Sequence, residues 1–171
     1  NHNLVALLSA GVGIRACGRL LKISPSTVMR RIRQLAAEVK PPPLLMGKTY
    51  EVDELVLFIK KKADNSGREF QLQGNQTVAR FSVGPRTNKT LRQVLTSLEL
   101  AAAKKIYTDG LKHYRYLLNR KVHCSKRYAN NHVERMHLNY RIHLKRFQRR
   151  GLGFSRSKAM LSATLKLYLW G

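Results

Sequence analysis

The order of hydrophobic patterns along the chain constrains its fold more than any other feature of the sequence. Residues 49–60, 68–73 and 77–83 are rich in β-branched and aromatic side chains, which predicts a meander of three antiparallel strands. Beyond them the pattern switches between helical and extended periods. It predicts a helix capped by Asn88, further helices over 111–119, 131–150 and 155–170, and short strands at 105–108 and 122–124.

Three strands followed by alternating strands and helices are the element order of the ribonuclease H-like fold. We therefore expect an α/β domain with a mixed five-stranded sheet and helices on its faces. In that arrangement the first and fourth strands, 49–60 and 105–108, are neighbours.

The first forty residues have a different pattern, which is typical of a helix-turn-helix. Helices are predicted at 4–8 and 14–21, and a longer one over 27–39 whose N-cap is Ser24 or Ser26. Val28, Ile32 and Leu35 form the apolar stripe of the longer helix, and its arginines lie largely off that stripe. The candidate DNA contacts are Ser26, Thr27, Arg30, Arg31 and Arg33. The alternative is a small helical subdomain whose arginines are merely solvated.

Pro41-Pro42-Pro43 form a stiff, extended segment that separates these two patterns. We therefore predict a helix-turn-helix domain over 1–40, a Pro-rich linker over 41–47 and the ribonuclease H-like domain over 48–171.

The net charge of the chain indicates a polyanionic partner. Its 171 residues include 33 Lys and Arg against 9 Asp and Glu, a formal net charge of +24, yet 43% of them are hydrophobic, enough for a folded core. Nucleic acid is the leading candidate. Cys17 and Cys124 form no paired motif, which fits a reducing cytosol. We expect no membrane span, because Lys158 and Lys166 interrupt the most apolar run.

Three acidic residues stand out against this basic background. Residues 101–171 contain 17 basic residues but only two acids, Asp109 and Glu134, and Asp53 lies inside an otherwise apolar strand. If the predicted sheet brings them together, their mutual repulsion favours a bound cation, and oxygen ligands suit Mg²⁺ or Mn²⁺. Two such ions could serve phosphoryl transfer. Taken singly, the three residues could instead be a turn residue, a helix N-terminal acid and the partner of a lysine.

The helix predicted over 131–150 has a buried stripe and a polar face. Glu134 and Arg141 share the polar face, two turns apart, so Arg141 could hold the phosphate that reacts at the acids. The alternative is a coincidence of spacing on the surface. The buried stripe consists of Val133, Met136, Tyr140, Leu144 and Phe147.

Five of the six histidines lie between His113 and His143. His132, His137 and His143 are five and six residues apart, whereas one helix face requires spacings of three or four. We therefore do not expect a zinc site, and we expect these side chains to be solvated or to face DNA.

Several short motifs together resemble the IS-one family of bacterial insertion-sequence transposases. The most specific are Tyr-Thr-Asp-Gly at 107–110 and His-Val-Glu-Arg at 132–135, whose acids are separated by 24 residues. The others are Leu-Leu-Lys-Ile-Ser-Pro-Ser-Thr-Val at 20–28, Tyr-Glu-Val-Asp-Glu at 50–54, Val-Gly-Pro-Arg-Thr-Asn-Lys-Thr-Leu at 83–91, His-Leu-Asn at 137–139 and Phe-Ser-Arg-Ser at 154–157.

The resemblance implies a DDE enzyme that cuts and joins DNA at transposon ends with Mg²⁺. It implies that Asp53, Asp109 and Glu134 are the catalytic, metal-binding triad, that Arg141 is the basic residue of the motif, and that the helix-turn-helix binds terminal inverted repeats. It further implies action on double-stranded DNA, a homodimer or larger assembly on that DNA, and a cytoplasmic, nucleoid-associated protein in bacteria.

Two other functions are kept as alternatives. One is a catalytically inactive DNA-binding remnant or regulator that occupies the transposon ends, and the other is a general RNA- or ribosome-binding protein. The family usually begins with a Cys-rich zinc ribbon, and these residues contain none and begin without Met, so we expect a fragment of a longer protein.

Overall fold

The computed structural model describes residues 2–57, 59, 67–74, 77–85, 87–125, 131–147 and 155–171, without the side chains of 67–74 and 77. Contacts within the chain divide the protein into two compact units. The terminal unit consists of Asn1–Pro41, Phe58–Asp64 and Asn139–Gly171, and the sheet unit of Pro42–Leu57 and Asn65–Leu138. The predicted domain limits, 1–40 and 48–171, remain a prediction.

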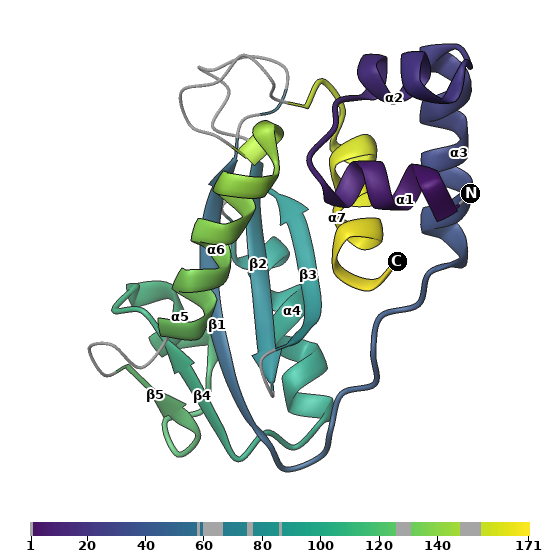
Figure 1. Ribbon diagram of the computed structural model, residues 1–171. Helices are drawn as coiled ribbons and strands as arrows, with labels where there is room; N and C mark the ends of the chain where they lie inside the picture. Colours follow the sequence, from purple (N-terminus) through teal and green to yellow (C-terminus); the bar gives the residue numbers. More distant parts are fainter. Residues whose placement is uncertain are drawn as a thin grey trace. The chain divides into compact units, whose positions relative to one another are not determined.

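The sheet unit contains a mixed five-stranded sheet, as the element order predicts (Figure 1). Its strands stand in the order β3-β2-β1-β4-β5, with β1 antiparallel to β2 and parallel to β4, and β2 antiparallel to β3 and β4 parallel to β5. The predicted contact between the first and fourth strands is thereby confirmed. The strands are β1 (Thr49–Leu57), β2 (Gly67–Gly74), β3 (Thr77–Gly84), β4 (Lys105–Thr108) and β5 (His123–Cys124).

The core of the sheet unit joins β1 and β4 to two helices, α4 (Asn88–Leu100) and α5 (Lys112–Leu117). Its members include Tyr50 and Val52 of β1 and Tyr114 of α5. Helix α4 contributes its apolar stripe, Leu91, Val94, Leu95 and Leu98. The predicted cap of α4 is wrong by one residue: Thr87, whose backbone is extended, accepts the N–H of Thr90 at 3.3 Å. Asn88 instead starts the helix, and its Oδ1 lies 2.9 Å from Nδ1 of His113.

Helix α6 (Asn131–His143) ends earlier than the predicted helix over 131–150. A 3₁₀ turn, η1 (Lys145–Phe147), follows it, and residues 148–150 lie outside the described residues. The N–H of Phe147 bonds to the carbonyl oxygen of Leu144, three residues back, which tightens the chain. Phe147 thereby packs against Tyr140, with ring centroids 5.8 Å apart. The predicted stripe is confirmed, because Val133, Tyr140, Leu144 and Phe147 are buried and Met136 is half-buried.

In the described part of the terminal unit, four helices share one apolar core. Val28 and Ile32, two of the predicted stripe residues, are fully buried there together with Leu4 and Leu8, and Leu167 joins them from the last helix. The helices are α1 (His2–Ser9), α2 (Ile14–Leu21), α3 (Pro25–Glu38) and α7 (Lys158–Trp170). None of the helices in the described residues is long and apolar enough to span a bilayer.

Two caps define where helices of the terminal unit begin. Ser24 is the N-cap of α3, accepting the N–H of Thr27 at 3.1 Å, which decides between the two predicted candidates. Helix α7 is capped by Ser157 rather than opened by Ser155 as predicted. Ser155 instead forms an isolated parallel bridge with Ile59.

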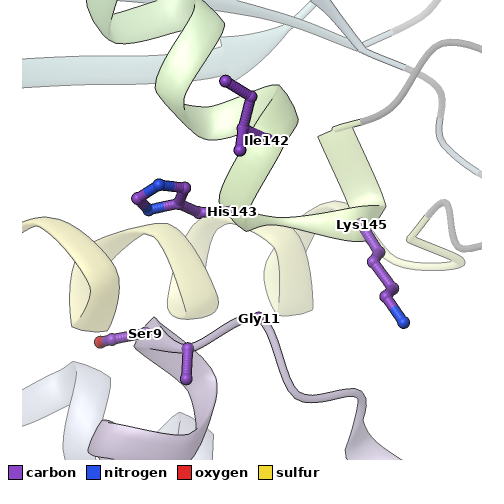
Figure 2. A pocket seen from close by; sticks show the side chains of 6 residues that line it. Ser9, Gly11, Ile142, His143 and Lys145 are labelled. Carbon is purple, nitrogen blue, oxygen red and sulfur yellow. The ribbon is translucent and has the colours of Figure 1, made fainter.

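Among the described glycines, Gly11 has the least room for a side chain. Its φ is +76°, and a Cβ at this position would overlap the carbonyl oxygen of His143 at the end of α6. Both observations require glycine. Figure 2 shows the adjoining hollow of about 420 Å³, which lies between the turn that follows α1 and the end of α6 and is lined by Ser9, Ile142 and Lys145 among others.

Candidate active site

The strand register places two of the three predicted acids side by side. Val52 of β1 pairs with Thr108 at the end of the parallel strand β4, and Asp53 and Asp109 are the residues that directly follow this pair. In parallel strands, residues in register point to the same face of the sheet. Asp53 lies within β1 and Asp109 directly follows β4, at the carboxyl edge where α/β sheets hold ligands.

Among the three predicted acids, Asp53 has a strongly raised pKa. Its side chain is only 14% exposed, and its pKa is raised from 3.8 to about 7. Burial is the main cause, and the N–H of Glu54, which donates to Oδ1 at 2.7 Å, opposes it. The charges of Asp109, Glu134 and Glu54 raise the pKa further. Asp109 and Glu134 therefore lie close enough to Asp53 to disfavour its charge.

Asp109 is oriented by the loop that leads into α5. Its Oδ1 accepts the N–H of Leu111 at 3.1 Å, so one carboxylate oxygen is held by the backbone. Before it, the hydroxyl of Thr108 lies 2.8 Å from Nε2 of His123 on β5. Burial, and secondarily the charge of Arg115, lowers the pKa of His123, which favours the neutral ring.

Glu134 lies in the first turn of α6, and the start of this helix is held by Glu51 of β1. The Glu51 carboxylate accepts the N–H of Val133 at 3.2 Å through Oε2, and its Oε1 lies 2.6 Å from Nδ1 of His132. A carboxylate at this position satisfies a free N–H of the first turn and interacts favourably with the helix dipole. Glu134 itself is exposed.

A second contact joins the same strand to the same helix. His137 is 4% exposed, and its Nδ1 lies 3.6 Å from Oδ2 of Asp53. For this residue the expectation of a solvated or DNA-facing histidine is wrong, because His137 follows Val133 by four residues and shares its buried side of α6. Glu51 and His137 were not identified from the sequence as neighbours of the three acids. The four-residue spacing between Val133 and His137 could have indicated that His137 is buried.

The donor chemistry of the three acids fits a hard divalent cation. Burial and neighbouring carboxylates disfavour the charge on Asp53, and a cation would remove that cost. Within the described ranges, no three His, Cys, Asp or Glu side chains are already arranged as a metal-binding group.

The remaining predicted site residues lie in the terminal unit. Arg141 is half-buried, two turns beyond Glu134 along α6. Arg30, Arg31 and Arg33 are exposed on α3. The other two predicted DNA contacts belong to the cap of α3: the hydroxyls of Ser26 and Thr27 each lie 2.8 Å from Oγ of Ser24.

Comparison with known families identifies the family of the chain. A family model described as IS1 transposase matches residues 49–169, a range that includes β1, β4 and α6. The chain belongs to the IS1 transposase family. The family resemblance drawn from the sequence motifs is thereby confirmed, and membership supports a role in transposition.

Curated members of the IS1 family are similar to part of the chain. It is 37% identical over 95 residues to the insertion element IS1 protein InsB of Shigella flexneri, covering 55% of this chain and 72% of that protein. It is 36% identical over 95 residues to the insertion element IS1 4 protein InsB of Escherichia coli strain K12, covering 56% of that protein. The chain thus spans little more than half the length of the Escherichia coli relative.

Proposed function

We propose that this IS1-family chain is a DDE transposase that binds the inverted repeats at the ends of its insertion sequence, cuts DNA there and joins it to a target. Asp53, Asp109 and Glu134 are its catalytic acids, carried by a ribonuclease H-like fold. The observation that carries this proposal is the register of β1 and β4 together with the repulsion that Asp53 experiences from the other two acids.

The three acids would hold Mg²⁺ or Mn²⁺, most simply as two ions. When bound, such ions activate a water or a 3′-hydroxyl for attack at phosphorus and stabilise the leaving oxygen. The chain itself positions the acids: Leu111 holds one oxygen of Asp109, and Glu51 holds the start of the helix that carries Glu134. Asp53 must be deprotonated to act as a ligand, which its pKa of about 7 allows near neutral pH.

DNA recognition falls to the terminal unit in this proposal. Helices α2 and α3 act as a helix-turn-helix, with Arg30, Arg31 and Arg33 on the exposed face of α3 and Ser26 and Thr27 at its start. Arg141 binds a phosphate of the DNA. Two transposon ends must be brought together, so the protein acts as a homodimer or larger assembly, and it associates with the bacterial nucleoid.

The decisive experiment is the substitution Asp109→Asn, which keeps an oxygen acceptor for the N–H of Leu111 but removes the charge. We expect loss of Mg²⁺-dependent cleavage of terminal-repeat DNA, by about a hundredfold or more, with unchanged or slightly higher DNA affinity. Glu99→Gln, which removes an exposed acid of α4, is the matched control and should cleave normally.

Cleavage by Asp109→Asn at the parental rate would refute the catalytic assignment. A parent protein that binds the repeats but never cuts them, with either Mg²⁺ or Mn²⁺, would instead identify a regulator that occupies the transposon ends.

A further inference from the structure

A pocket in the terminal unit combines positive charge with the amino ends of two helices. It has a volume of about 450 Å³ and lies where α2 and α7 begin, with both N-cap residues, Gly13 and Ser157, on its wall. Three arginines, Arg15, Arg146 and Arg156, also line it.

No negative charge in the lining offsets these arginines. None of the described residues that line the pocket is acidic. In the sequence of the whole terminal unit the only acids are Glu38 and Asp64. The pocket is therefore a region of strong positive potential, where an anion is favoured.

Arg146 shows this excess of positive charge most clearly. Its Nη1 donates to the hydroxyls of Thr164 at 3.0 Å and Ser155 at 3.4 Å, which are neutral partners. No carboxylate in the described part of the chain forms an ion pair with it. Burial is the main cause of its lowered pKa, and the nearby Cys17 acts in the opposite direction without cancelling it, as expected for a cation withdrawn from water. A bound anion would supply that compensation.

The helix ends add to the arginines. Gly13 caps α2 without any side-chain hydrogen bond, so backbone N–H groups in the first turn of α2 remain available. In α7 the Ser157 hydroxyl accepts the backbone N–H of Met160 at 3.5 Å, which leaves the other N–H groups of that turn without a side-chain cap from the described residues. Each helix also places the positive end of its dipole at the pocket.

We propose that this pocket binds a phosphate of the DNA backbone. Part of its lining is apolar, including Met29 and Met160, and suits the deoxyribose carbons on either side of a phosphodiester. The proposal rests on the proposed function, because it assumes that DNA is the ligand of this protein. It also gives a role to Ser155, Arg156 and Ser157 of the Phe-Ser-Arg-Ser motif.

The position of the pocket on α3 favours DNA over a small free anion. Met29 lies on its wall, and the next two residues, Arg30 and Arg31, are exposed on the helix that we propose enters the major groove. A phosphate bound here would fix the register of that helix on the duplex.

The test compares the double substitution Arg15→Gln and Arg156→Gln, at two exposed pocket residues, with Lys89→Gln and Arg92→Gln, which remove two exposed charges of α4. Binding of the full chain to a labelled duplex is measured by fluorescence anisotropy over a series of NaCl concentrations. We expect the pocket variant to bind the duplex about tenfold more weakly. The slope of log K against log [salt] should become less steep by about 0.9, the value for one phosphate. The control should keep the parental slope.

A second measurement uses inorganic phosphate as the probe and follows backbone amide resonances by NMR. The amides of Ile14 and Lys158, at the starts of α2 and α7, should shift saturably in the parent and not in the pocket variant. Equal salt slopes for the pocket and control variants, or unmoved amides, would overturn the proposal. So would saturable phosphate binding that leaves DNA affinity unaffected, because the site would then take a free anion.

Failure of the proposed function would look different. A parent protein that does not cut terminal-repeat DNA would refute the transposase assignment, whereas the salt slope and the phosphate titration need neither cleavage nor a specific sequence.

Discussion

Asp53 is a residue whose charge is costly in the fold that holds it. The strand buries it among other carboxylates, and its pKa of about 7 lies well above the 3.8 of an unperturbed aspartate. The folded protein therefore retains a proton that the unfolded chain releases near pH 4. Stability is lost as the pH rises from about 4 to about 7, and the full penalty applies above pH 7.

The substitution Asp53→Asn should remove this penalty. With divalent ions chelated, we expect the variant to be more stable than the parent at pH 8, by at most about 4 kcal/mol, and equally stable near pH 4. Urea denaturation at the two pH values measures the difference. An identical difference at both pH values would contradict the raised pKa of Asp53.

Glu51 is expected to act on the candidate site through the helix whose start it holds. Glu51→Ala removes the acceptor of the Val133 N–H and should cost about 1–2 kcal/mol, as loss of a helix cap does. We expect faster hydrogen exchange at the Val133 amide and slower cleavage, with unchanged DNA affinity. Glu51→Gln retains one carbonyl acceptor and should recover part of both effects. Unchanged exchange at Val133 in the alanine variant would refute this positioning role.

At the scale of elements, the limits of helices depend on where the chain can turn. Thr87 and Asn88 are both good N-caps, and the extended backbone at Thr87 decides between them. Helix α6 stops at His143, where the carbonyl group meets the turn at Gly11 and the chain tightens into a 3₁₀ turn. The periodicity of residues 131–150 continues through this point, so the sequence pattern alone does not reveal the stop.

The contact at Gly11 predicts a measurable cost for any side chain there. Gly11→Ala should destabilise the terminal unit by about 2–4 kcal/mol, since a positive φ and an overlap with the His143 carbonyl both oppose it. Gly47 also has a positive φ, +63°, but open space around it, so Gly47→Ala is the matched control and should cost only about 1 kcal/mol. Chemical denaturation measures both, and equal losses would show that the close approach is unimportant.

At the scale of the whole molecule, charge dominates the expected behaviour. A net charge of +24 makes binding to any duplex depend on the release of counterions. If about six phosphates are neutralised, log K should fall against log [salt] with a slope near −5. Fluorescence anisotropy with terminal-repeat and random duplexes checks this, and a slope near zero would rule out a backbone-binding role for the basic residues.

The sequence by itself determined the order of elements, the neighbouring first and fourth strands, the family, and the three acids that stand out against a basic background. All four depend on local periodicity, composition and short motifs, which can be read from neighbouring residues in the sequence. Tertiary structure decided which side chains meet across long separations. The cap that Glu51 provides for α6, the burial of His137 beside Asp53, and the pocket where α2 and α7 begin all join residues far apart in sequence. Register and packing bring such residues together. The spacing from Val133 indicates that His137 is buried, but no local pattern indicates that it lies beside Asp53.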